Sequence, residues 1–520
     1  MGLLHLQRLI SSQSQQRDRR HRPRRGKINQ EPCLQDDEAS RADKKMACVE
    51  PSLPEDIWHH IHSLLPLQDA ACAACVSQAF LRCWIYRPNL TFSPETLNFK
   101  NQYNEGDEIS ADMSTQLVTR IERIVRKHEG ILKALKLELL DCPDIDNYDL
   151  HSWLFFAFKS QVEELSLWLH SDFTEVYNFP WQFFSEGRGN SIRSLHLSCC
   201  ALRPVTGLGC LTNISILELY DVCISGEDLG CVLSSCPALE ELHLMDCSEI
   251  ICLEIPSLLH QLSHLVVSEC ENLDVIQSKA PNLCSFVYSG EEAQFSLGDS
   301  LENLKIMGSG WDEIVGYARE RLPHMVPKLE YLDICSSFER DTPVVPGEFL
   351  YLNHLAISFV SWSSGFCPDY DYLSLVSFLD VCPALETFEL SVSQDSMDHA
   401  LVSGDPLRQM AGHHHDNLKD VSISGFCSAK SMVELTSHIL ENATSLESLV
   451  LDPSASEVRG CSDESTPCRP ISRRMVMEAR RVVSTIQKYI LGKVPSTVEL
   501  TVVEPCARCR GTLSRDAKLL

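Results

Sequence analysis

The stretch Cys236 to Cys247 reads CPALEELHLMDC and contains the pattern that organises most of this chain. Its central hexamer, LEELHL from Leu239 to Leu244, has the form L-x-x-L-x-L. The last three positions alternate apolar, polar and apolar, as in a short strand that buries one face. One hexamer is too short to bury its leucines alone, so the strand needs neighbours of the same kind.

Copies of this hexamer, with conservative replacements, recur thirteen times between residues 132 and 451. They are LKALKL (132), VEELSL (162), IRSLHL (192), ISILEL (214), LEELHL (239), LSHLVV (262), LCSFVY (283), LENLKI (301), LEYLDI (329), LNHLAI (352), LETFEL (385), LKDVSI (418) and LESLVL (446). Successive copies begin 18 to 33 residues apart. Stacked copies form a parallel sheet over one continuous core. The pattern resembles a leucine-rich repeat and predicts an α/β solenoid, with helices or irregular segments returning between strands.

Cysteines occupy a particular position in this repeat. Cys200, Cys247 and Cys270 each lie three residues after the last apolar position of a hexamer. In repeats of this class that position turns inward and takes Asn or Cys, so we expect structural thiols. The 24 cysteines are scattered through a long chain, which favours reduced thiols in an intracellular protein over a secreted disulfide scaffold.

Both ends of the repeat array are expected to be covered. Before the array, a helix is predicted over Ala111 to Glu129 and ends at Gly130; one face holds Leu117, Ile121, Ile124, Val125 and His128. After it, Ser472 can cap a helix that ends at Gly492 and presents Met475, Ala479, Val482, Val483, Ile486 and Ile490 on one side. A closing strand is predicted over Ser496 to Val503.

Upstream of the array, residues 53–84 read LPEDIWHHIHSLLPLQDAACAACVSQAFLRCW and predict two or three short helices. Pro54 suits a first helical turn, and Pro66 ends that helix. Two apolar sets repeat the spacing 0, 4, 7 and 8: Ile57, Ile61, Leu64 and Leu65, then Val76, Phe80, Cys83 and Trp84. Some thirty residues cannot bury so many apolar groups, so part of this surface must contact the next domain or another protein.

The same residues resemble an F-box, the helical module that docks on the Skp adaptor of cullin-RING ubiquitin ligases. The resemblance implies a set of adaptor-binding residues: Leu53, Pro54, Ile57, Ile61, Leu64, Leu65, Val76, Ser77, Phe80 and Trp84. With the repeats, the CPALE copies at 236 and 382 and the closing helix, residues 53 to about 505 resemble plant F-box/leucine-rich-repeat proteins, including the FBD-associated group.

The expected organisation has six parts: a disordered basic tail (1–50), the F-box (51–95), the repeat solenoid (111–452), a mobile loop (453–471), a C-terminal cap (472–505) and a tail (506–520). The basic cluster from Arg17 to Lys27 is either a nuclear import signal or a solvated tail, so the nucleus, the cytoplasm or both are expected.

The resemblance implies a non-catalytic subunit that binds the Skp adaptor, the cullin-RING core and an unknown protein substrate. The net charge is −27, and no apolar run of 18 residues occurs, so neither nucleic acid nor membrane is an expected partner. The alternative is a repeat scaffold that works without ubiquitin transfer. An extracellular receptor-type repeat is disfavoured because a signal peptide and the Gly-x-Ile-Pro signature are both missing.

No cofactor or metal is expected from the sequence. Adjacent side chains in His413-His414-His415 point in alternate directions, so a polar loop is the favoured interpretation. The pair Cys506-x-x-Cys509 lacks rigid partners for zinc, and Cys72-x-x-Cys75 is better explained by helix packing. The sequence contains no nucleophile elbow, phosphate-binding glycine loop or HExxH motif.

Overall fold

A computed structural model of the chain describes residues 54–99, 110–170, 176–185, 189–203, 211–308, 310–340, 342, 347–360, 370–393, 406–410, 414–453 and 473–503. The predicted disordered tail, most of the predicted mobile loop, the capping Ser472 and the tail 506–520 lie outside these residues. No helix in the described ranges is long and apolar enough to cross a membrane.

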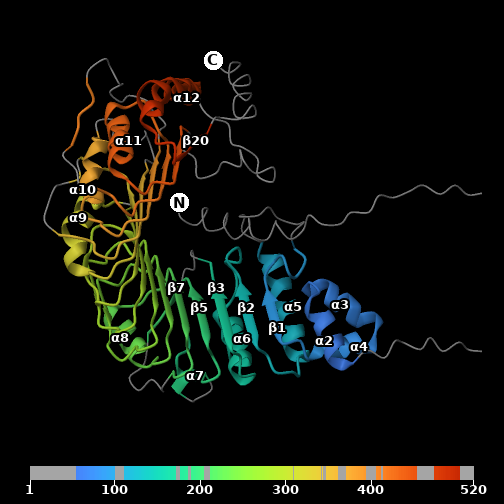
Figure 1. Ribbon diagram of the computed structural model, residues 1–520. Helices are drawn as coiled ribbons and strands as arrows, with labels where there is room; N and C mark the ends of the chain where they lie inside the picture. Colours follow the sequence, from blue (N-terminus) through green and yellow to red (C-terminus); the bar gives the residue numbers. More distant parts are fainter. Residues whose placement is uncertain are drawn as a thin grey trace, which may run out of the picture. The chain divides into compact units, whose positions relative to one another are not determined.

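The described repeats form one sheet of fifteen parallel strands, in the order β1-β2-β3-β5-β7-β8-β10-β12-β14-β15-β16-β17-β18-β19-β20. Figure 1 shows these strands side by side. Every one of the thirteen hexamers is a strand, which confirms the predicted α/β repeat fold. The thirteen are β2 (Ala134–Glu138), β3 (Glu164–Trp168), β5 (Ser194–Ser198), β7 (Ile216–Tyr220), β8 (Glu241–Met245), β10 (His264–Ser268), β12 (Ser285–Gly290), β14 (Asn303–Gly308), β15 (Tyr331–Ser336), β16 (His354–Phe359), β17 (Thr387–Val392), β18 (Asp420–Ser424) and β19 (Ser448–Asp452).

The strands keep one register although the segments between them vary in length. Leu217 pairs with Leu242, Leu242 with Leu265, and Leu265 with Phe286, and all four side chains are buried. The apolar positions therefore form continuous rows that face a single core. The residues between them alternate to the opposite face.

The return segments contain helices of different lengths: α6 (Asn147–Lys159), α7 (Gln182–Ser185), α8 (Gly226–Ser234), α9 (Ile314–Met325), η1 with α10 (Tyr372–Leu375, Val376–Leu379) and α11 (Lys430–Asn442). Helices α8 to α11 lie along one side of the sheet (Figure 1). Where helices are short or missing, small parallel sheets form: β9-β11-β13 (Cys252–Ile255, Val275–Ser278, Gln294–Ser296) and β4-β6 (Tyr177–Asn178, Cys200–Ala201).

A left-handed residue follows several strands and turns the chain into the core. Asp221, Asp246 and Glu269 have φ angles of 50°, 54° and 53° immediately after β7, β8 and β10. The next residues after the last two are Cys247 and Cys270, which are buried as expected. Their thiols reach back to the carbonyl oxygens of Met245 and Ser268, at 3.4 and 3.6 Å, so they act as small apolar groups with a weak donor.

The sheet begins earlier than predicted. Strand β1 (Asn89–Phe92) pairs with β2, although its residues fall within the range predicted as F-box. Helix α5 (Ala111–Lys127) follows as expected, with Leu117 and Ile121 buried. Gly130 is not the left-handed residue that ends this helix. A Cβ atom there would lie 2.8 Å from Cα of Tyr86, so the glycine instead permits a close approach of two chain segments.

The C-terminal end is covered by a helix and a strand. Helix α12 (Arg473–Thr485) continues into a π-helical turn, Ile486–Ile490, and a 3₁₀ turn, Leu491–Lys493, which contains Gly492. Val482, Ile486 and Ile490 are buried, as the predicted apolar face requires. Strand β20 (Glu499–Val502) pairs with β19, so the predicted closing strand is confirmed.

Candidate functional site

Three short helices precede the sheet: α2 (Glu55–Ser63), α3 (Leu67–Val76) and α4 (Gln78–Ile85). Pro54 and Pro66 occupy the N-cap positions of α2 and α3, where a residue without an N–H group leaves no helical hydrogen bond unmade. The predicted second apolar set is broken, because α3 ends at Val76 and Ser77 has an extended conformation. Val76 therefore does not share a helical face with Phe80 and Trp84.

Aromatic and imidazole rings hold α2 against α4. Trp58 meets Phe80 edge-on with 5.2 Å between ring centroids, and His62 lies near both Phe80 and Trp84. His62 is buried, with Nε2 3.4 Å from the carbonyl oxygen of Ala70 in α3. Burial and the charge of Arg87 lower the pKa of His62, so its ring is neutral at pH 7 and packs as part of this small core.

The predicted adaptor-binding residues divide into two groups. Ile57, Leu64 and Val76 are 40%, 71% and 85% exposed, and Pro54 is also exposed. The others that the structure describes are partly buried: Ile61, Leu65, Ser77, Phe80 and Trp84; Leu53 lies outside the described residues. Leu81 is 43% exposed and was not among the predicted residues. Leu81 lies five residues after Val76, and the predicted apolar sets use only the spacings 4, 7 and 8. The apolar pattern therefore did not identify Leu81.

Arg87 ties the three helices to the sheet. Its guanidinium donates hydrogen bonds to the carbonyl oxygens of His62 (3.1 Å), Leu65 (2.9 Å) and Asn89 (3.1 Å). Two of these acceptors lie at the C-terminal end of α2, where carbonyl groups have no helical partner, and the third begins β1. The carbonyl oxygen of Arg87 lies 2.8 Å from Nε2 of His128, just after α5. One residue thus connects the helical module, the first strand and the first long helix.

The polar face of the sheet contains paired charges. Glu218 lies between His196 and His243 on adjacent strands, with its carboxylate 2.6 Å from Nδ1 of the first and 3.5 Å from Nδ1 of the second. Burial opposes the charge of Glu218, but the hydrogen bond and the nearby histidines outweigh it and lower its pKa. Similar cross-strand pairs are Lys136 with Glu164 and Lys305 with Asp333. Both histidines contact carboxylates on the polar face of the sheet.

Comparisons with known proteins agree with this arrangement. A model described as the At1g61320/AtMIF1 LRR domain matches residues 124–507, and the F-box domain matches residues 51–91. The chain belongs to the F-box/leucine-rich-repeat family. Proteins of this kind are generally non-catalytic adaptors.

Several relatives in Arabidopsis thaliana share the family at low identity. The F-box/LRR-repeat protein At3g03360 is 24% identical over 57% of this chain, which covers 61% of that relative's length. The FBD-associated F-box protein At5g38590 is 23% identical over 69% of this chain and 81% of its own length. The F-box/LRR-repeat protein At5g02910 is 24% identical over 59% and 61%.

A cavity of about 350 Å³ lies where the F-box helices meet α5. Its lining residues are Leu67, Gln68, Ala71, Trp84, Thr96, Leu97, Asn98, Arg120, Arg123 and Ile124. Trp84 therefore faces the repeats, while Ile57 faces solvent. The F-box of this family member thus packs against the repeats on the side of Trp84 and exposes apolar side chains to solvent on the side of Ile57.

Cysteines of this F-box/leucine-rich-repeat chain are free thiols throughout the described residues. Burial raises the pKa of Cys199 to about 12 and that of Cys200 further, so neither provides a thiolate at neutral pH. Cys72 and Cys75 are exposed on α3, which contradicts the packing role predicted for them. The buried face of this helix is formed by Leu67 and Ala70 instead.

The histidine run 413–415 also differs from the predicted polar loop. His414 is exposed, but His415 is buried, and its backbone N–H donates to the carbonyl oxygen of Asn442 at 3.0 Å. His413, Cys461, Cys468, Cys506 and Cys509 lie outside the described residues. The alternation expected for adjacent side chains holds, yet it directs one ring inward instead of leaving all of them in solvent.

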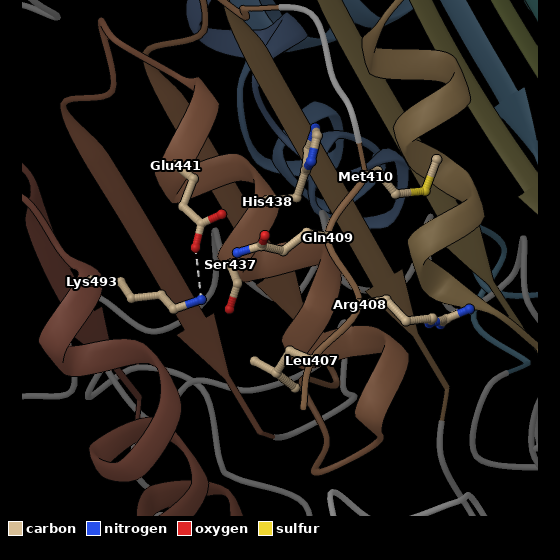
Figure 2. Close-up of a pocket in the computed structure, with 8 residues that line it drawn as sticks. All are labelled: Leu407, Arg408, Gln409, Met410, Ser437, His438, Glu441 and Lys493. Atoms are coloured by element: carbon tan, nitrogen blue, oxygen red, sulfur yellow. Dashed lines mark hydrogen bonds and ion pairs between the residues drawn. The ribbon is translucent and has the colours of Figure 1, made fainter. Parts of the chain in front are cut away.

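Residues 406–410 pass close to α11, and a buried acid fixes them there. Glu434 of α11 accepts hydrogen bonds from Nε and the backbone N–H of Arg408 at 2.7 and 2.8 Å, and Asp371 accepts from the same guanidinium. Figure 2 shows this segment beside α11, together with the ion pair of Glu441 and Lys493 at 2.8 Å. A cavity of about 30 Å³ remains between them, enough for a single water molecule.

Proposed function

We propose that this chain is the substrate-recognition subunit of an SCF-type cullin-RING ubiquitin ligase. The supporting observation is the exposure of Leu64 and Val76, which are large apolar side chains at the ends of F-box helices. Exposed apolar groups gathered on one small module are typical of a protein-binding surface. The proposed partner at this surface is a Skp-family adaptor, which connects the chain to the cullin-RING core.

The proposed role of the repeats is to hold a protein substrate. The polar face of the sheet presents alternating charges, such as Lys136 with Glu164 and Lys305 with Asp333, which suits a polar protein surface. The chemistry is then supplied elsewhere: a ubiquitin-loaded enzyme acts on a lysine that this chain holds nearby. No catalytic group and no cofactor are proposed for the chain itself. The proposed compartment is the nucleus, the cytoplasm or both.

The second candidate is a repeat scaffold that works without ubiquitin transfer. It is favoured by Trp84, which packs against the repeat side and lines the cavity at the joint. It is disfavoured by Ile57, Leu64 and Val76, because a module that served only to cover the array would bury these side chains.

Replacing Leu64 and Val76 together with Asp tests the proposed function. Both side chains are exposed in the free chain, so the double change is expected to leave folding intact and to remove binding of the Skp adaptor. We expect co-purification with the adaptor to fall at least about tenfold, since two apolar contacts of an interface core contribute more than 1.4 kcal/mol together.

The matched control is Ile251→Asp, which changes a side chain that is 61% exposed on the repeats. It is expected to bind the adaptor as the unchanged chain does. Equal adaptor binding by Leu64→Asp/Val76→Asp and the unchanged chain would contradict the proposal. Point changes are preferable to deletion of residues 53–84, because deletion would leave the buried guanidinium of Arg87 without its acceptors at the end of α2.

A further inference from the structure

Two histidines and an aspartate from different return segments meet beside α11. Nε2 of His415 lies 3.4 Å from Nε2 of His438 and 3.8 Å from Oδ1 of Asp380. One ligand atom from each residue lies within 4.8 Å of the other two, and no other such group of His, Cys, Asp or Glu occurs among the residues that the structure describes. The cluster is separate from the F-box surface and from the polar face of the sheet.

The three side chains are held by the fold. His438 belongs to α11, His415 lies just before β18, and Asp380 follows α10. Both histidines are buried, and the side chain of Asp380 is only 19% exposed. The backbone N–H of His415 donates to the carbonyl oxygen of Asn442, which lies one helical turn after His438, so the two backbone segments are held side by side. Asp380 precedes β17, His415 lies between β17 and β18, and His438 follows β18. The site therefore links three successive return segments.

The spacing of the two rings fits a metal better than a hydrogen bond. Tetrahedral zinc with bonds of about 2.0–2.1 Å places two ligand nitrogens about 3.3–3.4 Å apart. The two Nε2 atoms are 3.4 Å apart, whereas a strong protein hydrogen bond spans about 2.7–3.2 Å. The carboxylate is slightly farther away, within reach of a small rotation about its side-chain bonds.

We propose that Asp380, His415 and His438 form a binding site for a divalent transition metal of the zinc class. Two imidazoles and a carboxylate are borderline ligands that suit Zn²⁺ and Co²⁺ more than Mg²⁺ or Ca²⁺. Three protein ligands leave the fourth position for water. The metal would act as a structural link between neighbouring return segments.

The surroundings agree with this assignment. His438 is 5% exposed, so its ring is shielded from bulk water. Its other nitrogen, Nδ1, lies 3.3 Å from Nδ2 of Asn442, and the same amide nitrogen donates to the backbone carbonyl oxygen of His438 at 2.8 Å, so this side of the ring is held by α11. The buried guanidinium of Arg319 interacts electrostatically with Asp380, so we expect weaker binding than at a site with four protein ligands.

Titration of the purified, metal-stripped full chain with Co²⁺ tests the proposal under reducing conditions. Tetrahedral Co²⁺ bound by nitrogen and oxygen has visible ligand-field bands and lacks the intense near-ultraviolet absorption of cobalt–thiolate bonds, which separates this site from the many cysteines. We expect one such ion per chain, displaced by Zn²⁺. His415→Gln and His438→Gln are expected to weaken Co²⁺ binding by about tenfold or more.

The matched control is His414→Gln, which changes the exposed neighbour of His415 and should bind Co²⁺ as the unchanged chain does. Asp380→Asn gives a second, milder variant, and the unfolding temperature of each metal-free variant shows whether it folds. Retained Co²⁺ bands in folded His415→Gln and His438→Gln would overturn the proposal. So would an unchanged chain that shows no nitrogen–oxygen Co²⁺ band, because the rings would then form only a hydrogen-bonded pair.

Discussion

Glu339 is a buried carboxylate at the start of a helix to which it does not belong. The residue before helix α9, Glu313, has a left-handed backbone and provides no side-chain cap. Glu339, after β15, instead accepts the N–H of Val315 at 2.7 Å and so satisfies one of the free donors of the first turn. Burial raises the pKa of Glu339 to about 7, although hydrogen bonds to Val315, Ser336 and Gly316 oppose the shift.

This carboxylate makes stability depend on pH in a defined direction. Because the folded pKa of about 7 lies above the ordinary value of 4.5, the folded state favours the protonated form. The free energy of unfolding should therefore fall as pH rises from about 4.5 to about 7. Glu339→Gln is expected to remove this fall and to stabilise the chain at pH 8 by roughly 2–4 kcal/mol. Urea denaturation at pH 5 and pH 8 measures the difference, with exposed Glu330→Gln as the control. Parallel pH curves for both variants would refute the assignment.

Single residues could be predicted only where the repeat assigns them a position. Cys247 and Cys270 were placed correctly because they occupy a fixed position after a hexamer. The left-handed residues before them could not be identified, since Asp246 and Glu269 are ordinary residues that the turn forces into this conformation. The burial of His415 was missed for a related reason: three identical neighbours do not reveal which one faces inward.

At the scale of elements, helix α12 is attached to the array through a buried acid. Glu478 accepts hydrogen bonds from the backbone N–H of Ser428, at 2.8 Å, and from the hydroxyl of the same residue, at 2.5 Å. Both residues are buried, so the two donors would have no water to replace a lost acceptor. The apolar face of the helix, with Val482 and Ile486, adds the larger contact area.

Removing this acceptor is expected to loosen the C-terminal helix. Glu478→Ala removes the acceptor of two buried hydrogen bonds and should cost about 2–4 kcal/mol in the free energy of unfolding. Glu478→Gln keeps an acceptor oxygen and should cost less. Thermal unfolding together with limited proteolysis near residue 473 measures both effects, and Arg480→Ala, an exposed change on the same helix, is the control. Equal stability of the alanine and glutamine variants would show that the hydrogen bonds contribute little.

Elements were predictable in proportion to the regularity of their pattern. All thirteen hexamers became strands because each supplies the same alternation and a buried Leu, Val or Ile before it. Strand β1 was missed because Asn89 to Phe92 alternates over only four residues and has no preceding L-x-x-L. The break at Ser77 was missed because apolar spacing continues across it, whereas the backbone turns there without an obvious breaker.

At the scale of the whole molecule, Arg87 couples the F-box helices to the repeats. Arg87→Met keeps the apolar stem and removes the hydrogen bonds to His62, Leu65 and Asn89. We expect a cost of about 2 kcal/mol at this joint, or roughly thirtyfold faster hydrogen exchange in α2 and α4, with no change in β7 to β15.

The control for this change is Arg126→Met, since Arg126 forms an exposed pair with Glu122 one turn away. Hydrogen–deuterium exchange by mass spectrometry resolves the helices from the sheet. Unchanged exchange in α2 and α4 would show that apolar packing alone holds the joint. Exchange that rises equally in every strand would instead show global destabilisation.

The constant strand register also bears on how such chains can diverge. Return segments between successive hexamers range from short loops to whole helices, yet neighbouring strands stay aligned residue for residue. Doubling the length of a flexible connection costs only about 0.6 kcal/mol in closure entropy. Insertions and deletions in these segments can therefore accumulate without shifting the register of the strands, so a gene lineage can alter the return side of the array while the exposed face of the sheet stays in place.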